Sequence, residues 1–325
     1  MELFKQTKIY DFVKYSTYGL IVSTILCVAG IVLIVVKDFK LGIDFAGGNI
    51  VQIQYTNAEK APLAQIREIL SQDSRFSGFQ VSEFGAPNEA LLKLPVLDEA
   101  SQNNVDKVVN EVLAPSGEFE IRRSNSIGSK VGDEFKKKGI ISIVLALCAM
   151  MVYISFRYEW RFSLAGIMGL THDVVMVSAL VIITDLDFSL EVLAALLTLI
   201  GYSINGTIII FDRIREQMLS RRMKDMRYVI NEAVSATLSR TLLTSLTVFL
   251  VLLTLFIFGG EIIKGFSLPM LVGVVIAAYS SMFVAPRLAI VFGFSLEEYY
   301  KKEQKKRKKI EEKKRLRAMY ENGRV

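Results

Sequence analysis

The chain has 325 residues, of which 52% are hydrophobic, and its mean hydropathy is +0.39. Such a sequence is too apolar for an ordinary water-soluble protein of this length. The formal net charge of +6 is accounted for by residues 297–325, which carry 12 Lys and Arg against 6 Asp and Glu. This tail is predicted to be a solvated cytoplasmic helix, or a contact for anionic lipid or ribosomal RNA near a membrane.

Six apolar stretches are long enough to cross a hydrocarbon core of ~30 Å at ~20 residues each. They are residues 18–36, 140–156, 162–183, 192–211, 242–258 and 266–292. The first is predicted to be a retained span, not a signal peptide, because Lys37-Asp38-Phe39-Lys40 follows it in place of a small-residue cleavage site. Cys27 and Cys148 are predicted to be core residues. No spacing indicates a metal site, and no cofactor is expected.

Basic residues alternate between the two ends of these stretches, which predicts the orientation in the membrane. The N-terminus carries Lys5, Lys8 and Lys14, and further Lys and Arg residues lie between stretches two and three, between four and five, and in the tail. The link 184–187 has none, and the link 259–265 has only Lys264. Both termini are therefore expected in the cytoplasm of a bacterium, and the long segment after the first span outside its inner membrane.

We expect a cytoplasmic N-terminus (1–17), transmembrane helix 1 (18–36), a periplasmic domain with its connector (37–138), transmembrane helices 2–6 (139–293) and a basic cytoplasmic tail (294–325).

The outer segment has folding signals of its own. Alternating apolar residues predict strands at 49–55, 79–84, 90–95 and 118–122, with a turn at 85–88, and apolar residues at helical spacing predict helices near 62–70 and 105–113. The order βαββαβ is the ferredoxin-like arrangement, an α+β fold in which two helices cover one face of an antiparallel sheet. Its charge is nearly balanced, so no specific nucleic-acid surface is expected.

Polar side chains occur inside three of the apolar stretches, where an isolated charge costs ~2.5–3.5 kcal/mol. Asp173, next to His172, shares a helical face with Gly169 and Ala165, so it is expected to point into the bundle. The two residues form either a structural hydrogen-bonded pair or a proton-handling site. The pKa of such an Asp would be raised by burial and lowered by Arg240.

The fourth stretch contains a polar, glycine-flanked break, Gly201-Tyr202-Ser203-Ile204-Asn205-Gly206-Thr207, which leads into Asp212 and Arg213. Asn205 is either a satisfied interhelical hydrogen bond or part of an interior site. The fifth stretch bears one polar stripe, made by Arg240, Thr244, Thr247 and Thr254. The threonines are interpreted as helix–helix contacts or as the lining of a path, and Arg240 could instead extend to the interface.

Several motifs, in order, resemble the SecF family of bacterial protein-export subunits. They are Gly42-Ile43-Asp44-Phe45-Ala46-Gly47-Gly48, the run 156–162, Thr171-His172-Asp173-Val174, the run 201–216, the run 239–245 and the glycines of the last outer turn. The resemblance covers nearly the whole chain outside the tail.

The resemblance implies half of an RND-type transporter, completed by SecD into a twelve-span unit. Such a unit uses the proton motive force to help move secreted polypeptides outward, beside the Sec translocon channel and in contact with membrane lipids. The motif Gly42–Gly48 would then be the joint to the outer domain, and Arg240 would match the functional arginine of the family. Gly206 stands where these proteins usually have an Asp implicated in proton passage, so Asp173, with His172 as relay, becomes the leading titratable candidate.

Two other functions are compatible with parts of the pattern. An RND-type exporter of small molecules or lipids would usually have larger outer domains and both halves in one chain. An intramembrane serine protease would use Ser203 as nucleophile and His172 as base, but no glycine follows Ser203 at +2 and Asp173 already offers His172 a partner. We therefore expect a protein that binds and moves polypeptide and is not an enzyme.

Overall fold

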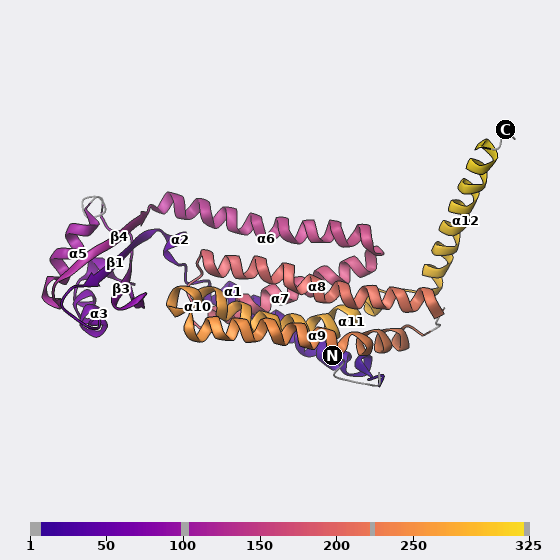
Figure 1. Ribbon diagram of the computed structural model, residues 1–325, viewed down its shortest axis with the longest axis horizontal. Coiled ribbons are helices and arrows are strands. Elements are labelled where there is room, and N and C mark those ends of the chain that lie inside the picture. The colour runs from indigo at the N-terminus through magenta and orange to yellow at the C-terminus, as the bar shows by residue number, and fades with distance from the viewer. Residues whose placement is uncertain (1–7, 99–103, 222–224, 322–325) are drawn as a thin grey trace.

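A bundle of long helices carries a small α+β domain at one end, as the computed structural model in Figure 1 shows. The structure describes residues 8–98, 104–221 and 225–321. Lys5, Arg222, Lys224 and the last residues of the basic tail, which entered the sequence predictions, lie outside the described residues.

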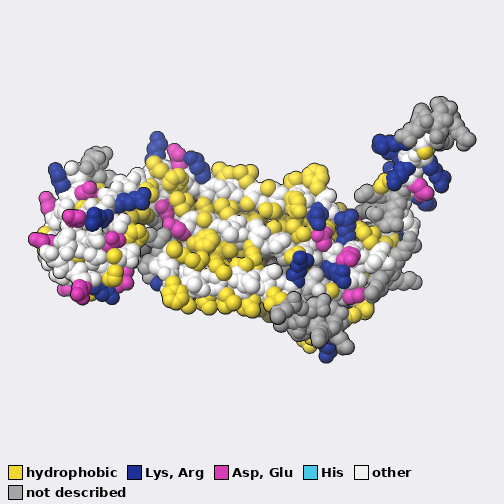
Figure 2. Space-filling view, in the orientation of Figure 1, with side chains coloured by type: hydrophobic (Ala, Val, Ile, Leu, Met, Phe, Trp, Pro, Cys, Tyr) yellow, Lys and Arg dark blue, Asp and Glu magenta, His cyan; other side chains and the backbone are white. Residues whose placement is uncertain are grey.

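Six helices are long and apolar enough to cross a membrane in the described chain, as predicted. They are α1 (Phe12–Lys37), α6 (Ser129–Arg157), α7 (Trp160–Ile183), α8 (Leu190–Arg221), α9 (Met226–Phe258) and a last helix in two parts. In the last helix, α10 (Gly260–Tyr279) passes through a π-helical turn, Ser280–Val284, into α11 (Ala285–Val291). Apolar side chains cover the middle of the bundle in Figure 2, and charged side chains gather toward its ends.

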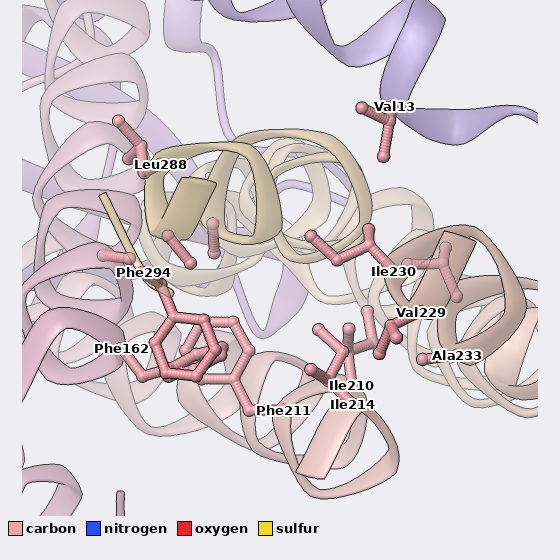
Figure 3. Close-up of a cluster of buried hydrophobic side chains, with 14 of the residues drawn as sticks. Val13, Phe162, Ile210, Phe211, Ile214, Val229, Ile230, Ala233, Leu288 and Phe294 are labelled. Carbon is pink, nitrogen blue, oxygen red and sulfur yellow. The ribbon is translucent and has the colours of Figure 1, made fainter. Parts of the chain in front are cut away.

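The helices are longer than the apolar stretches that predicted them. In particular, α9 begins at Met226, well before the predicted start at residue 242. Its first turns bury Val229, Ile230 and Ala233 in an apolar cluster that also contains Phe162 and Phe211 (Figure 3). The prediction missed this part because apolar packing on one face of a helix does not raise mean hydropathy enough.

The polar run 201–207 does not interrupt its helix, since α8 is continuous from Leu190 to Arg221. The helical geometry changes instead at the π-helical turn. Proline 286 follows that turn, lacks an N–H for the carbonyl of Met282, and would clash with this carbonyl in a regular helix. A local π turn accommodates such a conflict.

Both cysteines were expected in the core, and this is wrong for Cys148, which is exposed on α6. Helix α6 buries only 11% of its apolar window, so most of its side chains face outward. Cys27 on α1 is partly buried.

The outer domain has the predicted βαββαβ order. Its elements are β1 (Gly48–Tyr55), α3 (Leu63–Gln72), β2 (Gln80–Phe84), β3 (Ala86–Leu94), α5 (Val105–Leu113) and β4 (Phe119–Ile127). The antiparallel sheet has the strand order β2-β3-β1-β4, and α3 and α5 bury one of its faces. The turn predicted at 85–88 is shorter, because Gly85 alone (φ +67°) reverses the chain between Phe84 and Ala86.

Two backbone segments connect the outer domain to the helix bundle. One follows α1 through the short helix α2 (Ile43–Ala46) to β1, and the other runs from β4 into α6. Gly47 and Gly48 connect α2 to β1 with φ angles of +81° and +148°. A Cβ on Gly48 would lie 2.5 Å from the carbonyl oxygen of Leu94, so both the conformation and the space require glycine there.

Helix α12 (Leu296–Glu321) leaves the bundle at the end opposite to the outer domain (Figure 1). The side chains described in it beyond Tyr300 are exposed, which agrees with the solvated helix expected of the basic tail.

We expect Gly48→Ala to lower the free energy of unfolding of the full chain by about 2–4 kcal/mol, from the left-handed conformation and the clash with Leu94 together. Gly78→Ala is the matched control, because Gly78 also has a positive φ (+88°) but no atom within 4 Å of the new Cβ. It should lose only about 1 kcal/mol. Thermal unfolding in detergent measures both, and equal losses would contradict the proposed steric role of Gly48.

Candidate functional site

A carboxylate lies in the interior of the helix bundle. Asp173 of α7 is only 1% exposed. Its Oδ2 accepts hydrogen bonds from Ser203 Oγ of α8 at 2.5 Å and from Ser280 Oγ of the π-helical turn at 2.8 Å. The expectation that Asp173 points into the bundle is therefore confirmed.

The hydroxyl partners explain how the carboxylate is tolerated there. Ser203 and Ser280 are 2% and 1% exposed, so both serines are as deeply buried as the carboxylate to which they donate hydrogen bonds. A buried polar group without a partner costs ~1–3 kcal/mol, and more when it is charged. The site therefore joins α7, α8 and the last helix through one side chain.

His172 gives the site a second titratable group. Its Nδ1 lies 2.9 Å from Asp173 Oδ1, while its Nε2 is buried and has no hydrogen-bond partner among the described residues. Buried polar atoms are nearly always paired, so such a nitrogen calls for an explanation. The hydrogen bond between His172 and Asp173 fits the interpretation as a structural pair. The unpartnered Nε2 is compatible with the interpretation as a proton-handling site.

Ser203 is not arranged as a protease nucleophile. Its hydroxyl donates to Asp173 rather than to His172, and His172 directs Nδ1 to the same carboxylate. Nucleophilic catalysis needs the base within hydrogen-bond reach of the nucleophile. This geometry argues against the serine-protease alternative.

Asn205, Gly206 and Thr244 line a small cavity of about 40 Å³ between α8, α9 and α10. Gly206 faces the π-helical turn, where a Cβ would lie 3.4 Å from Ser281 Oγ. Asn205 is exposed and makes no hydrogen bond within the described chain, so the interhelical bond considered for it is not formed here. Gly201 has an open neighbourhood, since its Cβ would meet no atom within 4 Å.

The polar stripe of α9 is exposed in the described chain. Thr244, Thr247 and Thr254 are exposed, and each donates its hydroxyl to a carbonyl of its own helix. Within the described chain these hydroxyls bond only to their own helix. A row of polar groups on an exposed face of a membrane helix instead indicates a surface that another protein covers.

Arg240 does not reach Asp173. It is exposed and lines a separate cavity of about 480 Å³ with Asp212, Arg213 and Glu216. The two side chains, which the sequence suggested might interact, are therefore not brought together within the described chain. Helix α9 packs mainly against α8 and α10, whereas Asp173 is on α7.

A polar cluster ties α8 to the link between α6 and α7. Asp212 Oδ2 lies 2.5 Å from Arg157 Nη2, and Asp212 Oδ1 accepts from the Tyr158 hydroxyl at 2.6 Å. Arg213 pairs with Glu216 on the same helix at 2.7 Å. Burial and the carboxylate of Asp212 raise the pKa of Tyr158, so the phenol stays a hydrogen-bond donor.

The Gly42–Gly48 motif contacts the other end of the same helices. Gly42 N–H donates to the carbonyl of Phe188 at 2.8 Å, in the link between α7 and α8. Asp44 Oδ2 accepts from the N–H of Leu190 at 3.1 Å, the first residue of α8. This hydrogen bond caps one of the free N–H groups at the start of α8, so the connector is held where α8 begins.

Ser203 was considered only as a nucleophile and Ser280 was missed, although both complete the site. One signal could have found Ser280: the pair Ser280-Ser281 stands just before Pro286 in an otherwise apolar stretch. A metal site is not formed by the His, Cys, Asp and Glu residues that the structure describes.

We expect Ser280→Ala to destabilise the full chain by about 1–3 kcal/mol, because Asp173 loses a buried donor. Ser281→Ala is the control, since Ser281 is equally buried but donates to Ala278 of its own helix at 3.0 Å. It should change stability by much less. Equal effects in thermal unfolding would show that the bond to Asp173 is not stabilising.

Burial raises the pKa of Asp44 above its ordinary value of 3.8. Ionisation is then less favourable in the folded chain than in the unfolded one, so the contribution of Asp44 to stability falls as pH rises from 3.8 through the raised pKa. The difference in unfolding free energy between wild type and Asp44→Asn should decrease across that window and level off above it. A difference that increases with pH would contradict the assignment.

Comparison with known proteins gives consistent matches. The family model "Protein export membrane protein SecD/SecF, C-terminal" matches residues 107–295, and the model "SecD/SecF GG Motif" matches residues 32–59, which include Gly42–Gly48. Protein translocase subunit SecF of Helicobacter pylori strain 26695 is 54% identical over 325 residues, which cover 100% of both chains. The SecF of Escherichia coli O157:H7 is 32% identical over 295 residues, 89% of this chain and 90% of that one.

Solved structures show the same architecture. SecDF of Thermus thermophilus, a translocon-associated membrane protein, superposes with a TM-score of 0.75 at 28% identity over 90% of this chain. A second SecDF crystal structure, in a super-membrane-facing form, has a TM-score of 0.67 at 27% identity over 95% of this chain. The chain spans 39% and 41% of these two longer polypeptides.

Proposed function

Because this chain belongs to the SecD/SecF family of protein-export membrane proteins, we propose that it couples proton movement to polypeptide export together with a SecD subunit. It is a multi-pass accessory subunit of the Sec protein-export machinery. The observation that carries the coupling proposal is Asp173, a titratable group held by hydroxyls inside an apolar bundle. No observation favours the alternative function, an RND-type exporter of small molecules or lipids.

The SecD partner covers the open polar face of α8 and α9. Arg240, Thr244 and Asn205 are exposed on that face, and α9 buries only 11% of its apolar window. Lipid is a poor neighbour for an arginine and a stripe of hydroxyls, whereas a matching half would pair them. Arg240 would then act on a carboxylate of the partner, and the secreted polypeptide would pass beside the Sec channel.

The same charge pattern orients the chain in the inner membrane of a bacterium. Arg157, Arg213 and Arg215 lie at the end from which α12 leaves, which we place in the cytoplasm with both termini. Asp185 and Asp187 lie at the end that carries the outer domain, which we place in the periplasm.

Protonation of Asp173 changes which hydrogen bonds its side chain makes with Ser203 and Ser280. A carboxylate accepts from both serines, whereas a protonated carboxyl also donates and no longer requires the two donors. His172, through its free Nε2, is the relay. Because Ser280 belongs to the π-helical turn, the change alters the packing of the last helix against α7 and α8.

Movement of α7 and α8 reaches the outer domain through the connector. The link between these helices holds Gly42, and the start of α8 holds Asp44. Rocking of the two membrane halves would therefore shift the domain and the polypeptide that it contacts. The chain binds and moves its substrate and makes or breaks no covalent bond.

Cells that carry Asp173→Asn or Arg240→Ala should accumulate unexported precursor proteins, because coupling is lost. Asp106→Asn is the control, since Asp106 is an exposed carboxylate on α5, away from the bundle. Pulse labelling of precursor processing, at matched membrane levels of the chain, measures the effect. Normal processing in both mutants would contradict the coupling role.

A further inference from the structure

A cavity of about 860 Å³ separates the outer domain from the membrane bundle. Its roof is the face of the sheet that α3 and α5 leave open, and it includes Gln52 of β1 and Asn125 of β4. Its floor is the link between α7 and α8 together with the outer ends of α9 and α10. This volume is at the upper end of the ~300–1,000 Å³ of ligand pockets.

Strand β2 borders the cavity with its free edge. All of its residues, Gln80–Phe84, line the cavity, although successive side chains of a strand point to opposite faces. In the sheet order β2 is terminal, and no strand of the described chain pairs with its outer side. The outer side of β2 therefore borders the cavity, close to the start of α10.

One main-chain group of β2 is held by a side chain. Arg67 Nη2, from α3, donates to the carbonyl of Val81 at 2.8 Å, which shows that the Val81 peptide groups point out of the sheet. Peptide groups alternate in direction along an antiparallel strand, so those of Glu83, two residues on, point the same way. The edge thus offers the spacing of donors and acceptors that an extended chain matches.

We propose that an extended segment of the exported polypeptide binds in this cavity by adding to the sheet beside β2. The proposal rests on the function proposed above and names how its substrate is held. Strand addition binds through the main chain, so it is tolerant of sequence, as handling many different polypeptides requires. Arg67 keeps the edge satisfied when the cavity is empty and gives way to an N–H of the incoming strand.

The charges around the cavity favour a polypeptide over a phosphate-bearing ligand. Arg67, Lys93 and Lys264 are interspersed with Asp185, Asp187 and Glu191. An anionic headgroup or nucleic acid would meet these carboxylates as well as the cations. A strand that is bound through its main chain does not require a surface with charges of one sign.

The test is photo-crosslinking in inverted membrane vesicles that contain the full chain, SecD and the Sec channel. A secretory precursor is arrested partway through the channel, and a photoreactive amino acid replaces Ser82, in the middle of β2. The same amino acid at Glu111, exposed on α5 over the opposite face of the sheet, is the positional control. We expect an adduct with the precursor from position 82 and background from position 111.

Two matched variants then separate main-chain binding from mere proximity. Glu83→Pro removes an outward N–H without touching the hydrogen bonds between β2 and β3, whereas Glu83→Ala removes only the side chain and its ion pair with Lys60. Glu83→Pro should lower the yield from position 82 by about fivefold relative to Glu83→Ala. Arg67→Ala should raise the yield, because the competing donor is gone.

Each outcome decides the proposal. Equal yields in the two Glu83 variants, a yield lowered by Arg67→Ala, or no adduct at position 82 would overturn it. If export still depends on Asp173 while position 82 gives no adduct, docking at β2 fails and the proposed coupling stands. If Glu83→Pro does not assemble in the membrane, the Arg67→Ala result alone supports or contradicts the proposal.

Discussion

A carboxylate that is placed in an apolar bundle must find hydrogen-bond donors, and the packing of this protein is organised around that requirement. Asp173 meets it with hydroxyls from two other helices, one of them from a π-helical turn, and with a neighbouring histidine. The helices pack closely beside it: a Cβ on Gly169 would be in ordinary van der Waals contact with Ala285, at 3.5 Å. Loss or gain of a proton at this one group therefore bears on three helices at once.

The same helices are tied to other parts of the chain at both ends. Near the outer domain, Gly42 and Asp44 hold the connector to Phe188 and Leu190. At the opposite end, Asp212 binds Arg157 and Tyr158. Between these attachments α8 is continuous, so it can transmit a displacement along its length.

Much of the fold was predictable from local patterns, because hydropathy over a bilayer length and the 2.0 and 3.6 periodicities report which segments are helices or strands and which faces are apolar. The inward direction of Asp173 followed from its face on α7. The partners of Asp173 did not follow, since the rotation of one helix against another is set by packing over the whole bundle. Arg240 and Asp173 have compatible charges, but α9 packs mainly against α8 and α10, and Ser280 is presented by a π-helical turn that no local pattern predicts.

The most direct measurement of the central claim is the protonation of Asp173 itself. Infrared difference spectroscopy of the chain with SecD in lipid vesicles, recorded through a pH change and compared with Asp173→Asn, isolates the carboxyl stretch of this residue. We predict a band that appears on acidification, is absent in the variant, and shifts in Ser280→Ala because a hydrogen bond is lost. A carboxylate that stays ionised, or stays protonated, over the whole pH range in which export is coupled would contradict the account.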